Sequence, residues 1–187
     1  MPDQRSHRST PENPREFRTL VDRPQAREEL ALALARLWSD GGPPEAIVCI
    51  GTDRATGDAL GPLTGSFLLQ NPTRELVVHG TLDVPVHATN LHDIIRSHPR
   101  LLKSRVLAVD ASLGRPEEVG LITAGLGAIR PGAGVNKELP ALGRYYVTGT
   151  VNIGGFMDYY VLQNTRLALV MRMAHTIAEA ILLSLRL

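Results

Sequence analysis

Cysteine is almost absent from this sequence of 187 residues, which contains a single one, Cys49, inside an apolar run. One cysteine allows no disulfide within the chain and no metal site built from several thiolates. Free cysteine in proteins is usually a small buried residue, so we expect Cys49 to lie in the hydrophobic core.

An excess of charge of either sign is also lacking, because 20 basic and 19 acidic side chains leave a formal net charge of +1. Proteins that bind nucleic acids tightly usually present a basic face, and this balance therefore predicts no nucleic-acid partner. Hydrophobic residues make up 43% of the sequence, which is enough for a core in one domain of ordinary size.

Long uninterrupted apolar runs are missing as well. The N-terminal segment has no apolar stretch of the kind that a secretory signal needs. Residues 167–187 are very apolar, but Arg172, His175 and Glu179 interrupt them, which favours a buried helix over a membrane span. We therefore expect a cytoplasmic protein that has no membrane partner.

The pattern divides the chain into a tail and one domain. Residues 1–23 are polar, contain prolines and show no periodicity, which predicts a flexible N-terminal tail. Residues 24–187 are predicted to form a single α/β domain. This domain begins with a helix in which Leu30, Leu34 and Leu37 share one face.

Apolar runs with β-branched residues then alternate with segments of helical periodicity. The expected strands are residues 46–51, 75–80, 105–112, 119–126 and 145–153. One expected helix begins near residue 60, and two more span residues 87–98 and 158–187. This alternation predicts a three-layer α/β/α sandwich around a mostly parallel sheet.

Polar side chains follow three successive strands of the predicted sheet. They are Asp53, Arg54 and Asp58 after the first, Asp83 and His87 after the second, and Asp110 and Ser112 after the third. Sites in open α/β sheets form outside the carboxyl ends of the strands, so we expect these side chains to converge on one rim.

Asp58 and Asp110 have the clearest potential for chemistry. Pro62 fits only the first turn of a helix, so the helix starts near Asp58, where the helix dipole favours the ionised carboxylate. Asp110 ends a strand buried on both faces, and desolvation there raises the pKa of a carboxyl group. A charged and a protonated carboxyl side by side supply the base and the acid that hydrolysis needs.

Each of these residues also has a purely structural explanation, which the sequence leaves open. Asp58 is a favoured residue for a helix N-cap, and Asp110 is placed to cap the next turn or to pair with Arg115. Asp53 and Arg54 fit a solvated turn, and His87 fits the first turn of the following helix.

Motifs of other enzyme classes do not fit. Five residues separate Gly51 from Gly57, and Asp58 follows where a phosphate-binding loop needs lysine. The sequence has no G-x-S-x-G turn of a serine hydrolase.

Five blocks together resemble a known family. They read "IGTDRATGDALGP", "GTLDVPVHATNL", "VDASLGR", "PGAGVNKELPALG" and "TGTVNIGGFMDYYVLQNTRL". They resemble the YyaC-like sporulation proteins, which are described as predicted spore proteases. The resemblance runs from about residue 47 to the end of the terminal helix. That family is similar to the spore germination protease and, more distantly, to the hydrogenase maturation endopeptidases.

The resemblance implies an atypical aspartic peptidase on a phosphorylase/hydrolase-like α/β/α sandwich, located in the forespore or spore interior. "TGDALGP" and "VDASL" make Asp58 and Asp110 the counterparts of two catalytic aspartates of the germination protease. The maturation endopeptidases carry a nickel-binding histidine, but no histidine occurs in the matching region after Asp110. No metal and no other cofactor is therefore implied.

The main hypothesis is an endopeptidase of sporulation or germination. Asp58 and Asp110 activate water and protonate the leaving amine, while Asp53, Arg54 and Lys137 orient the substrate. The expected partner is a protein or peptide substrate, for which the resemblance suggests small acid-soluble spore proteins.

Two alternatives stay open. The chain is much shorter than the germination protease, which leaves room for a binding or regulatory protein with little or no catalytic activity on the same scaffold. The four aspartates Asp53, Asp58, Asp83 and Asp110 offer the oxygen ligands that hard cations prefer. The sequence also leaves the oligomeric state open, including a homo-oligomer.

Overall fold

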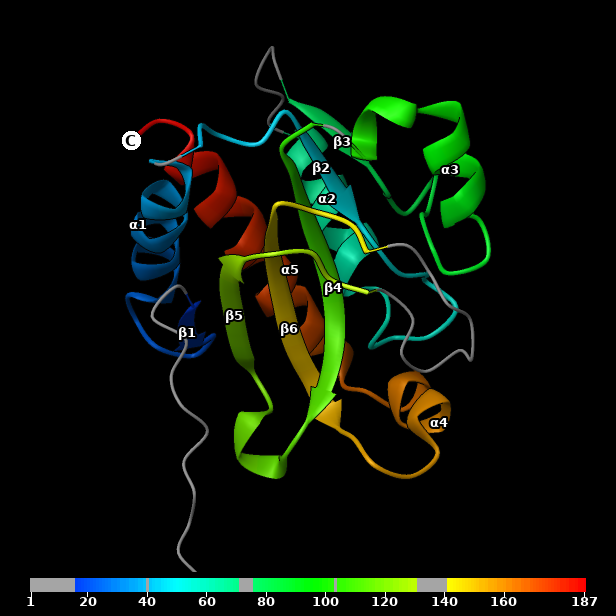
Figure 1. The fold of residues 1–187 in the computed structure, drawn as a ribbon. Coiled ribbons are helices and arrows are strands. Elements are labelled where there is room, and N and C mark those ends of the chain that lie inside the picture. The colour runs from blue at the N-terminus through cyan, green and yellow to red at the C-terminus, as the bar shows by residue number, and fades with distance from the viewer. Residues whose placement is uncertain (1–15, 40, 71–75, 103, 131–140) are drawn as a thin grey trace, which may run out of the picture.

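Six strands form one sheet in a computed structural model that describes residues 16–39, 41–70, 76–102, 104–130 and 141–187 (Figure 1). The strands are β1 (Glu16–Leu20), β2 (Ala46–Cys49), β3 (Val77–His79), β4 (Val106–Gly114), β5 (Leu121–Leu126) and β6 (Tyr145–Ile153). Their order across the sheet is β1-β5-β6-β4-β2-β3.

The central strands are parallel, as the continuous apolar runs predicted. β2 pairs in parallel with β3 and β4, and β4 pairs in parallel with β6, whereas β5 runs antiparallel to both of its neighbours. All four residues of β2 are buried, which is typical of a strand covered on both faces. The mostly parallel α/β fold is confirmed.

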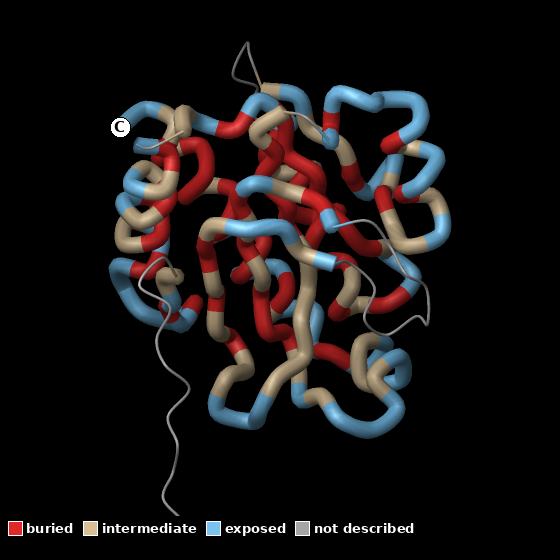
Figure 2. Tube along the Cα trace, in the orientation of Figure 1, coloured by how far each residue is buried: buried red, intermediate tan, exposed pale blue. Residues whose placement is uncertain are grey.

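Helices cover both faces of the sheet unequally (Figure 1). One face carries α1 (Ala26–Trp38), α2 (Leu60–Gln70) and α5 (Leu167–Ser184), and most of the large buried side chains lie in this layer. The other face carries α3 (Leu91–Ser97) and a short 3-10 helix, Pro99–Leu102, over a smaller cluster. Figure 2 shows the buried residues concentrated between these layers.

α5 is long and apolar enough to cross a membrane by length and composition alone. Half of it is nevertheless buried inside the protein, where it packs against both α1 and α2. It is therefore a core helix of this domain, as the interruptions in its sequence indicated.

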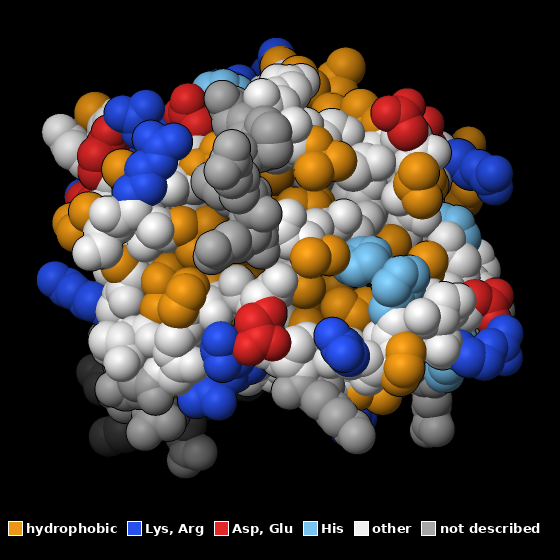
Figure 3. All heavy atoms as spheres, turned by 90° about the horizontal axis from the view of Figure 1, so that it is seen from above, with side chains coloured by type: hydrophobic (Ala, Val, Ile, Leu, Met, Phe, Trp, Pro, Cys, Tyr) orange, Lys and Arg blue, Asp and Glu red, His pale blue; other side chains and the backbone are white. Residues whose placement is uncertain are grey.

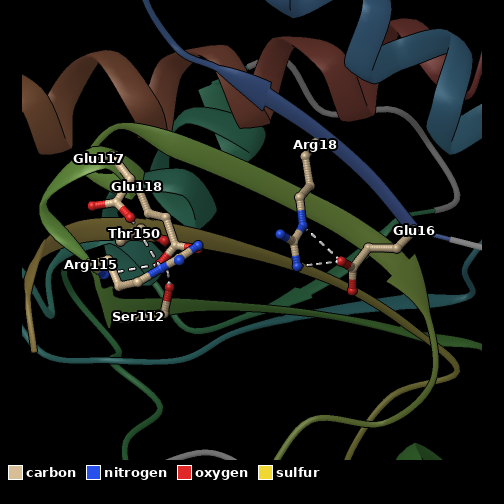
Figure 4. A network of polar contacts seen from close by, with 7 residues as sticks. All are labelled: Glu16, Arg18, Ser112, Arg115, Glu117, Glu118 and Thr150. Carbon is tan, nitrogen blue, oxygen red and sulfur yellow. Dashed lines mark hydrogen bonds and ion pairs between the residues drawn. The ribbon is translucent and has the colours of Figure 1, made fainter. Parts of the chain in front are cut away.

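The prediction of a flexible N-terminal tail is wrong for the residues nearest the domain. Residues 16–20 form β1, which pairs antiparallel with β5. The Tyr146 hydroxyl donates a hydrogen bond of 2.6 Å to the Glu16 carboxylate. Figure 4 shows Arg18, which pairs with the same carboxylate. The charged residues gave this segment the polar pattern of a tail, although it forms an edge strand in which Thr19 is buried. Residues 1–15 lie outside the described part of the chain.

The predicted terminal helix is two helices. α4 (Asp158–Gln163) ends before Asn164, and α5 starts at Leu167. The Thr165 hydroxyl donates to the Val161 carbonyl and the Asn164 amide donates to the Tyr160 carbonyl. Such side-chain hydrogen bonds compete with the helical backbone pattern, and Arg166 adopts an extended conformation between the helices.

Figure 3 shows the end of the sheet opposite to α4, where acidic and basic side chains are interspersed with apolar ones. The carboxyl ends of the parallel strands lie at the other end of the molecule, next to α4 (Figure 1).

Candidate functional site

A pocket of about 280 Å³ lies at the carboxyl ends of the parallel strands. The turn after β2 contributes Arg54 and Asp58, the segment after β3 contributes His87, β4 contributes Asp110, and α4 contributes Tyr159 and Leu162. The expected convergence of side chains from three strand ends is thus observed for Asp58, His87 and Asp110.

Close backbone packing fixes the turn between β2 and α2. Gly51 has a φ angle of +137°, and a side-chain carbon placed on it would lie 1.9 Å from the Asp58 carbonyl oxygen. A side-chain carbon on Gly61 would lie 2.0 Å from the Ile50 carbonyl oxygen. The first turn of α2 therefore rests directly on the end of β2, and this contact places Asp58 at the pocket.

Asp58 stabilises this turn and does not act as the simple helix cap that the sequence left open. Its carboxylate accepts a hydrogen bond of 3.0 Å from the Thr52 N–H, which belongs to the turn before α2. α2 begins at Leu60, two residues after Asp58, with Pro62 in the first turn as expected. The carboxylate is half-buried and lines the pocket.

The pKa of Asp58 shifts in the direction opposite to the one that the expected helix-dipole effect gives. Burial raises the pKa of Asp58 above its ordinary value. The Thr52 N–H and the nearby His87 lower the pKa of Asp58, but burial outweighs both.

Asp110 lies in the middle of β4, opposite Thr148 of β6, because β4 continues to Gly114 and does not end at Asp110 as expected. Burial raises the pKa of Asp110 well above its ordinary value, and the negative charge of Asp58 raises it further. A hydrogen bond from the Ala111 N–H opposes these effects at 2.9 Å. Of the two aspartates, Asp110 therefore holds a proton more readily.

Arg115 does not supply the ion pair that one structural explanation of Asp110 required. Its guanidinium group pairs with Glu118 at 3.0 Å and with Glu117 at 3.4 Å (Figure 4). Asp110 instead faces the pocket shared with Asp58.

His87 belongs to the pocket, although the sequence favoured a place in a helix. α3 begins only at Leu91, and the Asn90 side chain accepts a hydrogen bond of 2.8 Å from the His87 N–H. The His87 Nδ1 atom lies 2.7 Å from the Thr89 hydroxyl. The sequence placed His87 among the side chains that follow the second strand, but the apolar spacing of residues 87–98 also fitted a helix that would include it.

The other candidate residues have different surroundings. Arg54 is exposed and lines the pocket, whereas Asp53 and Asp83 are exposed and are not among the residues that line it. Lys137 lies outside the described residues. Across the ranges given above, no three histidine, cysteine, aspartate or glutamate side chains are grouped so that they could hold a metal ion. The four-aspartate cation site therefore receives no support.

Cys49 is fully buried, as predicted, at the end of β2. Burial raises the pKa of its thiol far above the ordinary value, so a thiolate nucleophile does not form there.

Comparison with known proteins supplies the family. Residues 18–180 match a family described as a protein of unknown function, DUF1256. The chain is also 45% identical to the uncharacterized protein YyaC of Bacillus subtilis (strain 168) over 177 residues, which are 94% of this chain and 86% of YyaC. The chain belongs to the DUF1256 family. The resemblance to YyaC-like proteins is confirmed, but the match begins at residue 18 and not near residue 47, so it includes most of β1 and all of α1.

Among solved structures, this DUF1256 chain resembles the NiFe hydrogenase maturation protease HycI from Thermococcus kodakarensis KOD1. The TM-score is 0.54 at 18% sequence identity, and the match covers 82% of this chain and 99% of HycI. At this identity the likeness shows a shared fold.

Proposed function

We propose that this DUF1256 protein is an endopeptidase in which Asp58 and Asp110 cleave a peptide bond with a water molecule. The supporting observation is that one pocket contains two carboxyl groups and that the charge of one raises the pKa of the other. Pairs of acidic groups whose pKa values differ are typical of acid–base hydrolysis. The likeness in fold to a maturation protease agrees with a peptidase.

The pKa directions assign the two roles. Asp110 has the higher tendency to hold a proton and serves as the general acid, which protonates the leaving amine. Asp58 remains the base, because the Thr52 N–H and His87 favour its charged form. It accepts a proton from water as the water oxygen bonds to the carbonyl carbon, and the carbon–nitrogen bond then breaks as the nitrogen takes the Asp110 proton.

Arg54 is the proposed contact for the substrate, because its exposed side chain borders the pocket and its guanidinium group donates to carbonyl or carboxylate oxygens. Asp53 and Lys137 remain proposed substrate contacts. The family resemblance favours a role in sporulation or germination inside the forespore, with small acid-soluble spore proteins as substrates.

Incubation of the full chain with purified small acid-soluble spore proteins, across a range of pH, tests the proposal. We expect cleavage by the wild-type protein and at least about a hundredfold loss on substitution Asp58→Asn or Asp110→Asn, since each removes one proton-transfer group. Asp83→Asn is the matched control, because Asp83 is an exposed aspartate at a neighbouring strand end.

Unchanged cleavage by the Asp58→Asn variant refutes the assignment of the base. Binding of these proteins without cleavage favours the alternative, a binding or regulatory protein on the same scaffold.

A further inference from the structure

Large apolar side chains are displayed next to the pocket. Phe156, Met157, Tyr159 and Tyr160 are all exposed, with 84% of Phe156 and 63% of Tyr159 accessible to solvent. We call these four residues the α4 lip. α4 has no buried residue, so the lip does not contribute to the core of the described domain. Exposed apolar groups gathered in this way usually mark an interaction site.

The α4 lip is held in place by specific local structure. The Gly155 N–H donates a hydrogen bond of 2.9 Å to the Asp158 carboxylate. Met157 has a left-handed backbone, with a φ angle of +56°, which is uncommon for a residue with a side chain. Strained backbone of this kind persists where the surroundings impose it and is frequent at binding sites.

The lip is continuous with the pocket and is fixed to the turn that carries Asp58. Tyr159 belongs to the lip and also lines the pocket, together with Leu162 one helical turn further on. The Gly57 N–H donates a hydrogen bond of 2.8 Å to the Leu162 carbonyl. A peptide that enters the pocket beside Tyr159 therefore meets the α4 lip and the pocket of Asp58 together.

We propose that the α4 lip is the specificity-determining surface of this enzyme and binds a large apolar side chain of an extended protein segment beside the bond to be cleaved. The proposal rests on the proposed peptidase function. The occupant follows from continuity with the pocket, because Tyr159 is exposed in the lip and also lines the pocket, and an aliphatic or aromatic side chain covers an exposed aromatic residue best. Small or charged side chains at the same position gain little from this contact.

The experiment uses a peptide library made from denatured proteins, with both sides of every cleavage site identified by mass spectrometry. We expect the wild-type protein to cut next to leucine, phenylalanine, methionine or tyrosine. The double substitution Phe156→Ser and Tyr159→Ser should reduce this preference by about tenfold, which is the usual effect of losing one apolar contact in a specificity pocket. Leu32→Ser is the matched control, because Leu32 is 50% exposed on α1.

A second measurement separates this inference from the catalytic proposal. The same library is passed over immobilised Asp110→Asn protein, with and without the double substitution, and the retained peptides are sequenced. One outcome is that the immobilised protein retains apolar peptides, that the double substitution abolishes this retention, and that the wild-type protein cleaves nothing. This outcome supports peptide binding at the lip and refutes the peptidase function.

Three results overturn the inference. The first is cleavage with the same residue preference in the double variant, which leaves the peptidase intact. The second is neither cleavage nor selective retention of apolar peptides. The third is a dimer, detected by size-exclusion chromatography, that the double substitution dissociates while the immobilised protein still retains the same peptides. That result makes the lip a subunit contact.

Discussion

Substitution of Gly51 by alanine tests the packing that positions Asp58. The added carbon would lie 1.9 Å from the Asp58 carbonyl oxygen, and such atoms essentially never approach within 3.0 Å. The turn must therefore open by about 1.1 Å, which is enough to break the 3.0 Å hydrogen bond between the Thr52 N–H and the Asp58 carboxylate. A displacement of about 1 Å at a reacting group can reduce the rate by about a hundredfold.

Gly127→Ala is a matched control because Gly127 has nearly the same backbone angle, with φ of +133° against +137°, but has no atom within 4 Å of the added carbon. Backbone strain costs about 1–3 kcal/mol in either variant. The steric clash adds about 1–3 kcal/mol in Gly51→Ala only. In a domain of this size each kcal/mol lowers the Tm by about 2–4 °C.

Thermal unfolding followed by circular dichroism measures this difference, and peptide cleavage measures the effect on the site. We expect Gly51→Ala to melt several degrees below Gly127→Ala and to lose most of its activity, while Gly127→Ala retains its activity. Equal melting temperatures together with full activity in Gly51→Ala would refute the packing argument.

Three further predictions concern ionisable groups. Because the folded protein raises the pKa of Asp110 above the unfolded value of about 3.9, stability falls as the pH rises between these two values, by about 1.4 kcal/mol for each pKa unit. Asp110→Asn should therefore raise the Tm at pH 7–8 but not below about pH 3.9, and no gain at neutral pH would contradict the burial of this charge. The activity should rise with pH as Asp58 ionises and fall at higher pH as Asp110 ionises. The substitution His87→Gln should move the acidic limb of this profile to higher pH, since His87 lowers the pKa of Asp58. An acidic limb that does not move would exclude His87 from the site. Cys49 should react with a thiol reagent only in denaturant, because it is fully buried, and rapid labelling of the native protein would contradict the core.

The sequence predicted the central fold well because buried parallel strands leave a local signal. Residues 145–153 form β6 with the predicted bounds, and the predicted strand at 105–112 differs from β4 by one residue at the start and two at the end. The end was missed because β4 continues only through its pairing with β6, where Leu113 lies opposite Asn152 beyond an irregularity in the register. That pairing joins segments far apart in the chain and leaves no trace in local periodicity.

β1 was missed, and His87 was also assigned to the first turn of a helix, for related reasons. β1 has only five residues, and its partner β5 lies about a hundred residues later in the chain, so the charged Glu16 and Arg18 dominated the local pattern. His87 precedes α3 in a turn formed by the Asn90 side chain, which accepts from the His87 N–H and donates to the Pro85 carbonyl. Asparagine turns of this kind interrupt a helical pattern without altering its apolar spacing.

The parts of the site differ in how far they are buried, and this difference determines how its chemistry and its specificity can vary. Asp58 and Asp110 come from a turn and a strand that are locked by backbone contacts with the buried sheet, including the contact at Gly51. α4 has no buried residue, and its Leu162 carbonyl accepts the Gly57 N–H. Side chains of the α4 lip can therefore change without moving the aspartates. A change at Gly51, in contrast, alters the carboxylate geometry and so lowers the cleavage rate of every substrate equally. Substitutions in the lip should accordingly alter which peptides are cleaved while leaving the pH profile in place. Substitutions in the turn should alter the pH profile and lower the cleavage of all peptides alike.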